Sequence, residues 1–154
     1  MKLKDEKKGF TLLELLIVIG LLAAVVLTIY SLYEFGTKTF MQQTNEITVG
    51  TELRDAMDLI LMECRKGQRF SNDDRSITTK DNIVTFELDD KLLKMIKTDR
   101  STGERTETVL CYSVSSFRFD VGTKKIDIAI CSDVKDSKGN EMLLEATHFI
   151  RGSN

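Results

Sequence analysis

An apolar run between Phe10 and Tyr33 constrains this 154-residue chain more than any other feature of the sequence. About 20 apolar residues in a helix are enough to span the hydrocarbon core of a bilayer. Four lysines precede the run, and basic residues on that flank keep their end of a membrane helix in the cytoplasm. The sequence therefore predicts a single-pass protein of the cytoplasmic membrane whose C-terminal part lies outside the cytoplasm.

A charged residue, Glu14, lies inside this run. A cleaved secretory signal does not fit, because the small residues Ala23 and Ala24 are followed by further apolar residues instead of a cleavage site. A plain signal anchor explains length and orientation but not Glu14, because a carboxylate within a membrane helix costs a few kcal/mol. Two explanations remain open from the residues: Glu14 reaches the headgroups, or it has a function.

The residues around Gly9 favour a function. The segment Lys8-Gly9-Phe10-Thr11-Leu12-Leu13-Glu14 resembles the cleavage and methylation motif of type IV prepilins and type II secretion pseudopilins. The resemblance implies that prepilin peptidase removes a leader, residues 1–9, by cutting between Gly9 and Phe10, and then methylates the new amine of Phe10. It also implies that Glu14 is a recognition and assembly residue, which pairs with the terminal amine of a neighbouring subunit.

The same resemblance implies the partners. They are prepilin peptidase, other pilin or pseudopilin subunits, the inner-membrane assembly platform, and the lipid bilayer before assembly into a cell-surface pilus or a pseudopilus. One departure is the absence of proline from the whole chain, whereas many pilins kink this helix at a proline. Gly20 and Gly36 are the remaining weak points of the helix.

The helical pattern continues beyond the apolar run, over residues 34–66, but becomes amphipathic. Apolar residues recur there at steps of three and four, opposite a face that includes Glu63. Arg65, Lys66 and Gly67 form a C-terminal helix signal. The sequence thus predicts one helix with an apolar half, 10–33, and an amphipathic half, 34–66, whose buried stripe consists of Ile47, Val49, Leu53, Ala56, Met57, Ile60, Leu61 and Cys64.

Residues 67–154 show the period of two that is typical of strands. About six strands are expected, at 83–88, 92–96, 108–114, 117–121, 126–131 and 141–150. The segments 98–107 and 133–140 are polar and predict loops, and 122–124 predicts a tight turn. The fold class is therefore α+β: a long N-terminal helix packed on a small antiparallel β-sheet domain.

The globular half offers little for catalysis, and we expect no catalytic residues, no cofactor and no metal. His148, the only histidine, is expected at the surface or on an edge strand. Asp133, Asp136 and Asn140 do not have the spacing of a calcium loop and predict a solvated turn.

The three cysteines lack metal-type spacing. A disulfide between Cys111 and Cys131 is one candidate, because disulfides are permitted outside the cytoplasm. Cys64 lies on the apolar stripe of the helix and predicts a small buried residue.

The resemblance places the chain among structural subunits, and the order of helix, strand pairs and short tail is more similar to minor subunits than to a major one. The alternative is a tip adhesin or DNA-capturing module on the same anchor, with basic residues of 65–75, Lys94, Lys97 and Arg100 as its surface. Acidic residues are interleaved with these, so nucleic acid is an improbable partner. A membrane-tethered enzyme is the least favoured class.

Overall fold

A computed structural model of the chain describes residues 11–136 and 138–150. One helix, α1 (Leu12–Lys66), precedes eight strands in the described residues. The strands are β1 (Arg69–Ser71), β2 (Ser76–Thr78), β3 (Asn82–Asp89), β4 (Leu92–Asp99), β5 (Arg105–Cys111), β6 (Val114–Val121), β7 (Lys125–Lys135) and β8 (Glu141–Phe149). The α+β class and the end of the helix at Lys66 are confirmed.

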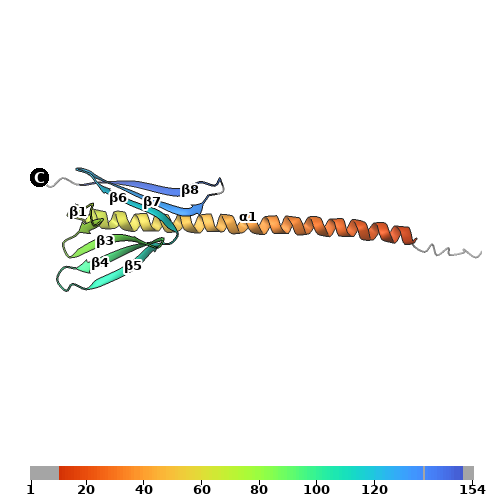
Figure 1. Cartoon of the computed structure of the whole chain (residues 1–154), viewed down its shortest axis with the longest axis horizontal. Helices are drawn as coiled ribbons and strands as arrows, with labels where there is room; N and C mark the ends of the chain where they lie inside the picture. The colour runs from red at the N-terminus through yellow and green to blue at the C-terminus, as the bar shows by residue number, and fades with distance from the viewer. Residues whose placement is uncertain (1–10, 137, 151–154) are drawn as a thin grey trace, which may run out of the picture. The chain divides into compact units, whose positions relative to one another are not determined.

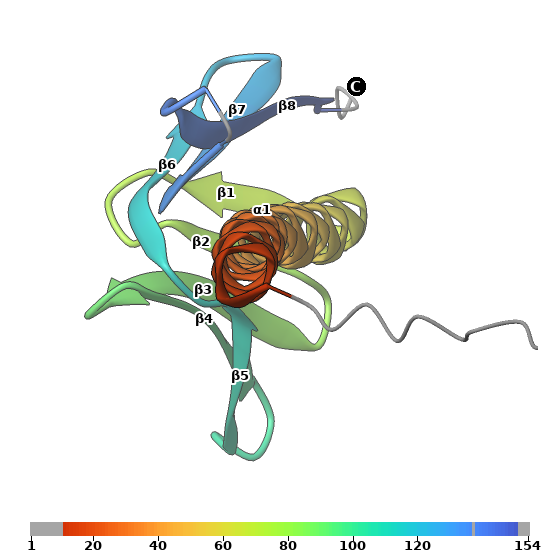
Figure 2. The same cartoon turned by 90° about the vertical axis from the view of Figure 1, so that its right-hand side faces the viewer.

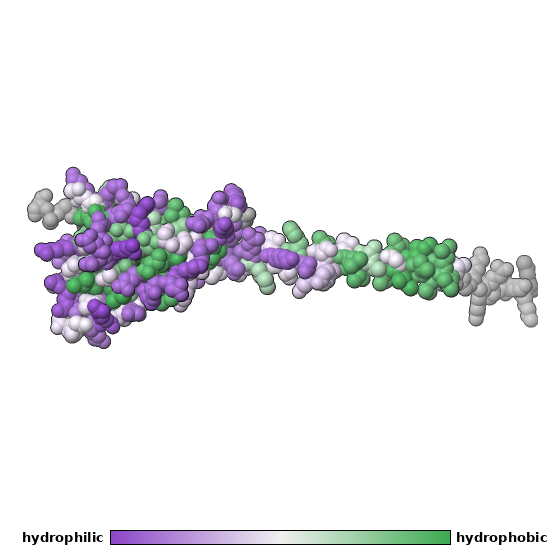
Figure 3. Space-filling model, viewed as in Figure 1, coloured by the Kyte–Doolittle hydropathy of each residue, from purple (hydrophilic) through white to green (hydrophobic). Residues whose placement is uncertain are grey.

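The chain divides into two compact units, Met1–Gln42 and Gln43–Asn154. In the first unit, the described residues form the apolar part of α1. Their large hydrophobic side chains are exposed, by between 51% at Ile17 and 81% at Leu12. Figure 3 shows hydrophobic residues gathered over this part of the helix.

The second unit combines the remainder of α1 with two antiparallel sheets. Sheet A has the order β1-β2-β3-β4-β5, and sheet B has the order β6-β7-β8. The C-terminal part of α1 lies between the two sheets (Figures 1 and 2). The sequence predicted strands on a helix but not their division into two sheets, nor the short strands β1 and β2.

The core of the second unit forms where the helix stripe meets the inner faces of both sheets. Leu53, Ala56, Met57, Ile60 and Cys64 of α1 are buried, as predicted. The expected burial of Ile47 is wrong, because its side chain is 70% exposed.

Aromatic contacts join the two sheets within this core. The ring of Phe86 on β3 lies 6.0 Å from that of Phe117 and 5.8 Å from that of Phe119, both on β6. The same hydrophobic core cluster also contains Ile77, Val84, Leu93, Met95, Leu110, Cys111, Val114, Ile126, Ile128 and Ile130.

Several strand boundaries differ from the predictions. The segment 98–107 was expected to be a loop, but β4 runs to Asp99 and β5 starts at Arg105, so the loop is shorter. The segment 133–140 is also partly strand, because β7 continues to Lys135. Pairing with a neighbouring strand satisfies the backbone of polar residues, so a polar composition does not by itself exclude a strand.

The predicted strand 108–114 is interrupted between β5 and β6. Ser113 has a φ of 57°, in the left-handed region, and the chain leaves sheet A there and enters sheet B. The hydroxyl of the buried Ser132 on β7 donates to the Ser113 carbonyl over 2.9 Å. This bond holds the crossover against sheet B.

Two other turns connect neighbouring strands tightly. Asp90 and Lys91, between β3 and β4, both have positive φ, at 41° and 68°. Positive φ at both central residues is the requirement of a type I′ hairpin turn. Gly122 closes the predicted turn before β7 with a bond from its amide to the carbonyl of Lys125, 2.8 Å long.

Candidate functional site

The N-terminus of α1 is held by a reciprocal capping interaction between Thr11 and Glu14. The backbone amide of Glu14 donates to Oγ1 of Thr11 over 3.3 Å. The backbone amide and the hydroxyl of Thr11 donate to Oε2 of Glu14 over 3.0 and 3.1 Å. This is a capping box, in which a Thr before the helix and a Glu three residues later satisfy each other's backbone donors. Glu14 therefore stabilises the start of its own helix.

The capping box was missed by the sequence reasoning, although its signal is present. Thr11-Leu12-Leu13-Glu14 has the spacing of a capping box before an apolar run. A carboxylate in the first turn also lies next to the partial positive charge of the helix N-terminus. Both effects reduce the cost of placing Glu14 at the beginning of a membrane helix. The predicted cleavage residues Gly9 and Phe10 lie outside the described residues.

The apolar part of α1 has the properties of a membrane span. An 18-residue window of the helix has a mean hydropathy of 2.9 and is not buried in the protein. The polar side chains within it are satisfied locally: the hydroxyl of Thr28 donates to the carbonyl of Ala24 over 2.8 Å, and that of Ser31 donates to Leu27 over 3.0 Å. Such bonds remove the cost of bringing an unpaired hydroxyl into lipid.

In the second unit, the largest departure from the sequence prediction is the burial of Glu63. This residue was placed on the polar face of the helix, but it is only 3% exposed. Its Oε1 accepts from Nζ of Lys97 on β4 at 2.8 Å and from Nζ of Lys66 at 3.2 Å. Burial opposes the charged form, yet the two ammonium groups outweigh it, and the pKa of Glu63 is lowered. The ion pair between Glu63 and Lys97 therefore links α1 to sheet A.

The cysteines are free thiols in the structure, so the candidate disulfide between Cys111 and Cys131 is not formed. Cys111 ends β5 in sheet A, whereas Cys131 lies on β7 in sheet B. Cys64 is buried as predicted, and burial, followed by the nearby charge of Glu63, raises its pKa to about 12. Thiols of this kind are poor nucleophiles at neutral pH.

His148 lies on β8, at an edge of sheet B, but on the inward-facing side of that strand, where it is half-buried. The expectation of a surface or edge-strand position is met by the edge strand, although the side chain itself is not fully exposed. Burial, followed by the positive charge of Arg65, lowers the pKa of His148.

The loop after β7 is organised by its own hydrogen bonds. Oδ1 of Asp136 accepts from the amides of Asn140 and Lys138 over 2.8 and 2.9 Å, and these bonds, that from Asn140 most of all, lower the pKa of Asp136. Asp133, which was expected in the same turn, lies instead on β7 and forms an ion pair with Lys91 at 2.6 Å. Within the described residues, no group of three or more histidine, cysteine, aspartate or glutamate side chains forms a candidate metal site.

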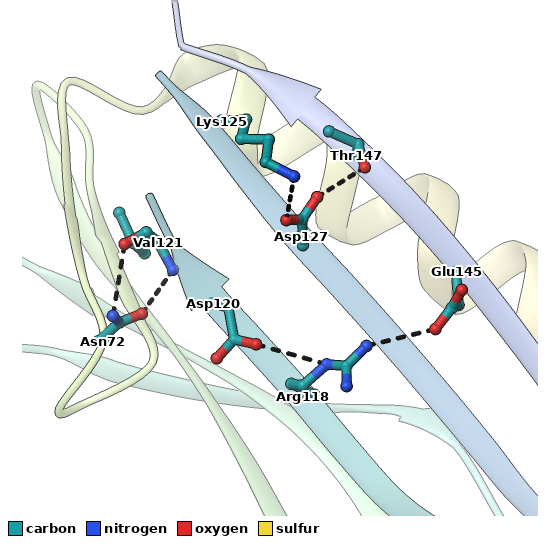
Figure 4. Close-up of polar contacts among 8 residues, drawn as sticks. All are labelled: Asn72, Arg118, Asp120, Val121, Lys125, Asp127, Glu145 and Thr147. Atoms are coloured by element: carbon teal, nitrogen blue, oxygen red, sulfur yellow. Dashed lines mark hydrogen bonds and ion pairs between the residues drawn. The ribbon is translucent and has the colours of Figure 1, made fainter. Parts of the chain in front are cut away.

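Ion pairs cross the outward face of sheet B (Figure 4). Arg118 on β6 contacts Asp120 at 3.4 Å and Glu145 on β8 at 3.3 Å. It thereby reaches over Ala129, its register neighbour on β7, which is only 7% exposed. Lys125 pairs with Asp127 at 2.7 Å, and these contacts leave the face with both signs of charge close together.

The lysines proposed for nucleic-acid capture are matched with carboxylates. Lys94 pairs with Asp89 at 2.6 Å, and Lys97 pairs with Glu63. Arg75 lies over the ring of Phe117, 5.9 Å from its centroid. These contacts favour an ordinary charged surface over a binding site for phosphates.

Comparison with known proteins identifies the N-terminal segment. Residues 5–30 match the family described as the prokaryotic N-terminal methylation motif. No curated protein and no solved structure matches the chain.

The chain thus combines a prepilin-type methylation motif over residues 5–30 with a long apolar N-terminal helix and a pilin-like α+β architecture. The match supports a place for this chain in the type IV pilin and pseudopilin family. Pilins are in general structural proteins that assemble with other pilins after processing by prepilin peptidase, and a helix of this kind fits membrane anchoring.

Proposed function

We propose that this chain is a minor subunit of a type IV pilus, a competence pilus or a type II secretion pseudopilus. In this proposal, prepilin peptidase cuts between Gly9 and Phe10 and methylates the amine of Phe10. The observation that carries the proposal is the methylation motif, residues 5–30, which overlaps the exposed apolar helix that begins at Leu12. The motif supplies the processing signal, and the helix supplies the surface for assembly.

The role proposed for Glu14 follows from the energetics of the two environments. In the bilayer, the carboxylate is stabilised by Thr11 and by the helix N-terminus. In a filament, the terminal amine of a neighbouring subunit would add an ion pair to that arrangement. Because an ion pair gains more in an apolar surrounding than in water, this contact would favour assembly and set the axial position of the subunit.

The proposed orientation has the N-terminus in the cytoplasm and the second unit outside the cytoplasmic membrane. The lysine-rich segment before Gly9 supports it. A tip adhesin or DNA-capturing module remains a less supported alternative, because the described lysines of the candidate surface are paired with acids.

The experiment that tests the proposal is mass spectrometry of the protein from cells with an active prepilin peptidase. The expected N-terminal peptide begins at N-methylated Phe10. The Gly9→Leu variant should keep its leader, because the bulky side chain does not fit where glycine is required. A wild-type protein that retains Met1, or a Gly9→Leu protein that is processed normally, would refute the proposal.

A further inference from the structure

Strand β5 ends sheet A with an edge that is open in the part of the chain that the structure describes. Its order in the sheet is last, and it pairs only with β4 there. Five consecutive residues, 105–109, are exposed, so both faces of the strand are open to solvent over this length. Figure 2 shows β5 at the edge of sheet A, extending away from α1. Such an edge offers unpaired backbone N–H and C=O groups to another strand.

The other three sheet edges are less suited to pairing. β1 has only three residues, and a short edge strand limits pairing. The side chain of Asn72 covers the edge of β6, because it accepts from the backbone amide of Val121 and donates to the Val121 carbonyl (Figure 4). Apart from its histidine, β8 carries only acids as ionisable residues, Glu141 and Glu145, so its charges cannot complement those of a second β8.

The charges on β5 have no ionic partner within the second unit. Arg105 and Glu107 lie two residues apart, so they share one face of the strand. Lys94 on the neighbouring strand pairs with Asp89 at 2.6 Å and not with Glu107. Among the described residues, neither Arg105 nor Glu107 forms an ion pair. Both charges are therefore available to a strand that is added to this edge.

The segment Arg105-Thr106-Glu107 is complementary to itself when read in the opposite direction. In an antiparallel pair centred on Thr106, Arg105 of each copy lies opposite Glu107 of the other. A pair centred on Arg105 or on Glu107 instead places like charges directly opposite each other, which is destabilising. A pair centred on Thr108 would require the buried Cys111 to face Arg105. Charge complementarity thus selects a second copy of β5 in one register.

We propose that the edge of β5 pairs antiparallel with β5 of a second copy of this chain, in the register centred on Thr106. The contact is isologous, because a two-fold axis relates its two Arg105–Glu107 pairs. Backbone hydrogen bonds between the strands supply the attraction, as in other cases of strand addition. The interface is small, so the association is weak, and the charges fix the register more than the affinity.

The direction of β5 indicates where the second copy comes from. Lys97, which binds Glu63, is the register partner of Thr106. Cys111, at the other end of β5, lies near Glu52: burial, followed by the charge of Glu52, raises the pKa of Cys111. β5 therefore runs against the direction of α1, and the α1 segments of two paired second units run in opposite directions. The contact joins chains of separate assemblies and so goes beyond the proposed function, in which the subunits of one assembly share one direction.

Disulfide trapping tests the register on the purified full chain in detergent micelles. In the proposed pair, the two copies of residue 106 lie directly opposite, about 4.5–5.5 Å apart between Cα atoms, which a disulfide can bridge. The two copies of residue 108 lie about 14 Å apart, which it cannot. On mild oxidation, Thr106→Cys should give at least about tenfold more linked dimer than the matched control Thr108→Cys. The wild type, which has the same native cysteines, supplies the background.

Charge exchange gives an independent measurement in the Thr106→Cys protein. Arg105→Glu or Glu107→Arg places like charges opposite each other twice, so each should lower the yield of linked dimer about tenfold. Mixing these two variants under different tags should restore the yield between differently tagged chains, because two acids then face two bases. Both positions are exposed, so the variants should resist proteolysis as the wild type does.

Each outcome decides between the second copy and its alternatives. Association through the apolar helix in micelles gives no preference between positions 106 and 108. Equal yields at these positions, or no recovery in the mixture, would therefore overturn the inference. A link from Thr106→Cys to a different protein in native membranes would also overturn it. The proposed function is tested apart from this, because a chain that keeps Met1 but forms the Thr106→Cys dimer refutes the proposed function alone.

Discussion

Glu63 on the last turn of α1 and Lys97 on β4 form an ion pair at 2.8 Å whose carboxylate is almost completely buried. Lys97 keeps 35% of its side-chain surface exposed, so the two partners differ in access to water. Removing the lysine leaves a buried charge with only Lys66 as a partner. Removing the glutamate leaves lysines that can turn toward solvent.

The first prediction follows from this asymmetry. Lys97→Met should lower the free energy of unfolding by about 2 kcal/mol, below the 3–5 kcal/mol range for fully buried pairs, because Lys66 remains and Lys97 is part-exposed. Glu63→Met should cost less. Pulse proteolysis in urea, on the full chain in detergent micelles, measures both. Equal costs for the two variants, or a larger cost for Glu63→Met, would contradict the asymmetry.

The second prediction concerns Gly67, directly after the helix. A Cβ at this position would lie 2.6 Å from Cγ2 of Ile77 and 2.6 Å from Cε1 of Phe70. Because Ile77 is completely buried, it cannot move aside without a rearrangement of the core. Gly67→Ala should therefore destabilise the second unit by about 1–3 kcal/mol. The neighbouring exposed variant Gln68→Ala serves as control, and the same proteolysis assay should find it close to wild type.

The third prediction concerns pH. The pKa of His148 is lowered in the folded protein by burial, and secondarily by Arg65, so the folded state binds the proton less well than the unfolded state. The stabilisation is fully present above the unfolded pKa of about 6.5 and is lost as pH falls through that value and then through the folded pKa.

Thermal unfolding between pH 7.5 and 5 measures this effect. The melting temperature of the wild type should fall with pH, and that of His148→Gln should fall less, because His148 is the only histidine. The carboxylates with lowered pKa, such as Asp136, titrate at lower pH and contribute little in this window. Parallel curves for the two proteins would show that His148 is not responsible.

The fourth prediction separates the two roles of Glu14. Glutamine can replace glutamate in a capping box but carries no charge. If the proposed charge pair with a neighbouring amine drives assembly, Glu14→Gln should be cleaved but poorly incorporated, as Glu14→Ala should be. Isolated filaments, or crosslinked membrane assemblies, provide the measurement. Wild-type incorporation of Glu14→Gln, together with a defect in Glu14→Ala, would instead assign the requirement to the cap.

The fifth prediction concerns the thiols. Mass spectrometry under non-reducing conditions should find the three cysteines reduced, in agreement with the structure. Cys131 is partly exposed and should be alkylated first, whereas Cys64, with a pKa near 12 and 1% exposure, should react only on unfolding. A bond between Cys111 and Cys131 would contradict the free thiols of the structure.

The sequence alone determined the features that depend on local order along the chain. The apolar run, the spacing from Gly9 to Glu14 and the signal at Lys66 predict the motif and the helix, because periodicity and capping act within a few residues. The hairpin turn at Asp90 and Lys91 and the turn at Gly122 are local in the same way. The spacing of Thr11 and Glu14 also predicts their capping box, although this signal was not recognised.

The tertiary structure decided the features that depend on residues far apart in the chain. From its position in the helix pattern, Glu63 is expected at the surface. In the folded chain β4 places Lys97, which is 34 residues away in the sequence, against its carboxylate. The division into two sheets depends on the left-handed Ser113 and on Ser132, which is contributed by a later strand. Such contacts form only when the chain has folded, because their energies depend on burial and on partners that the local pattern does not specify.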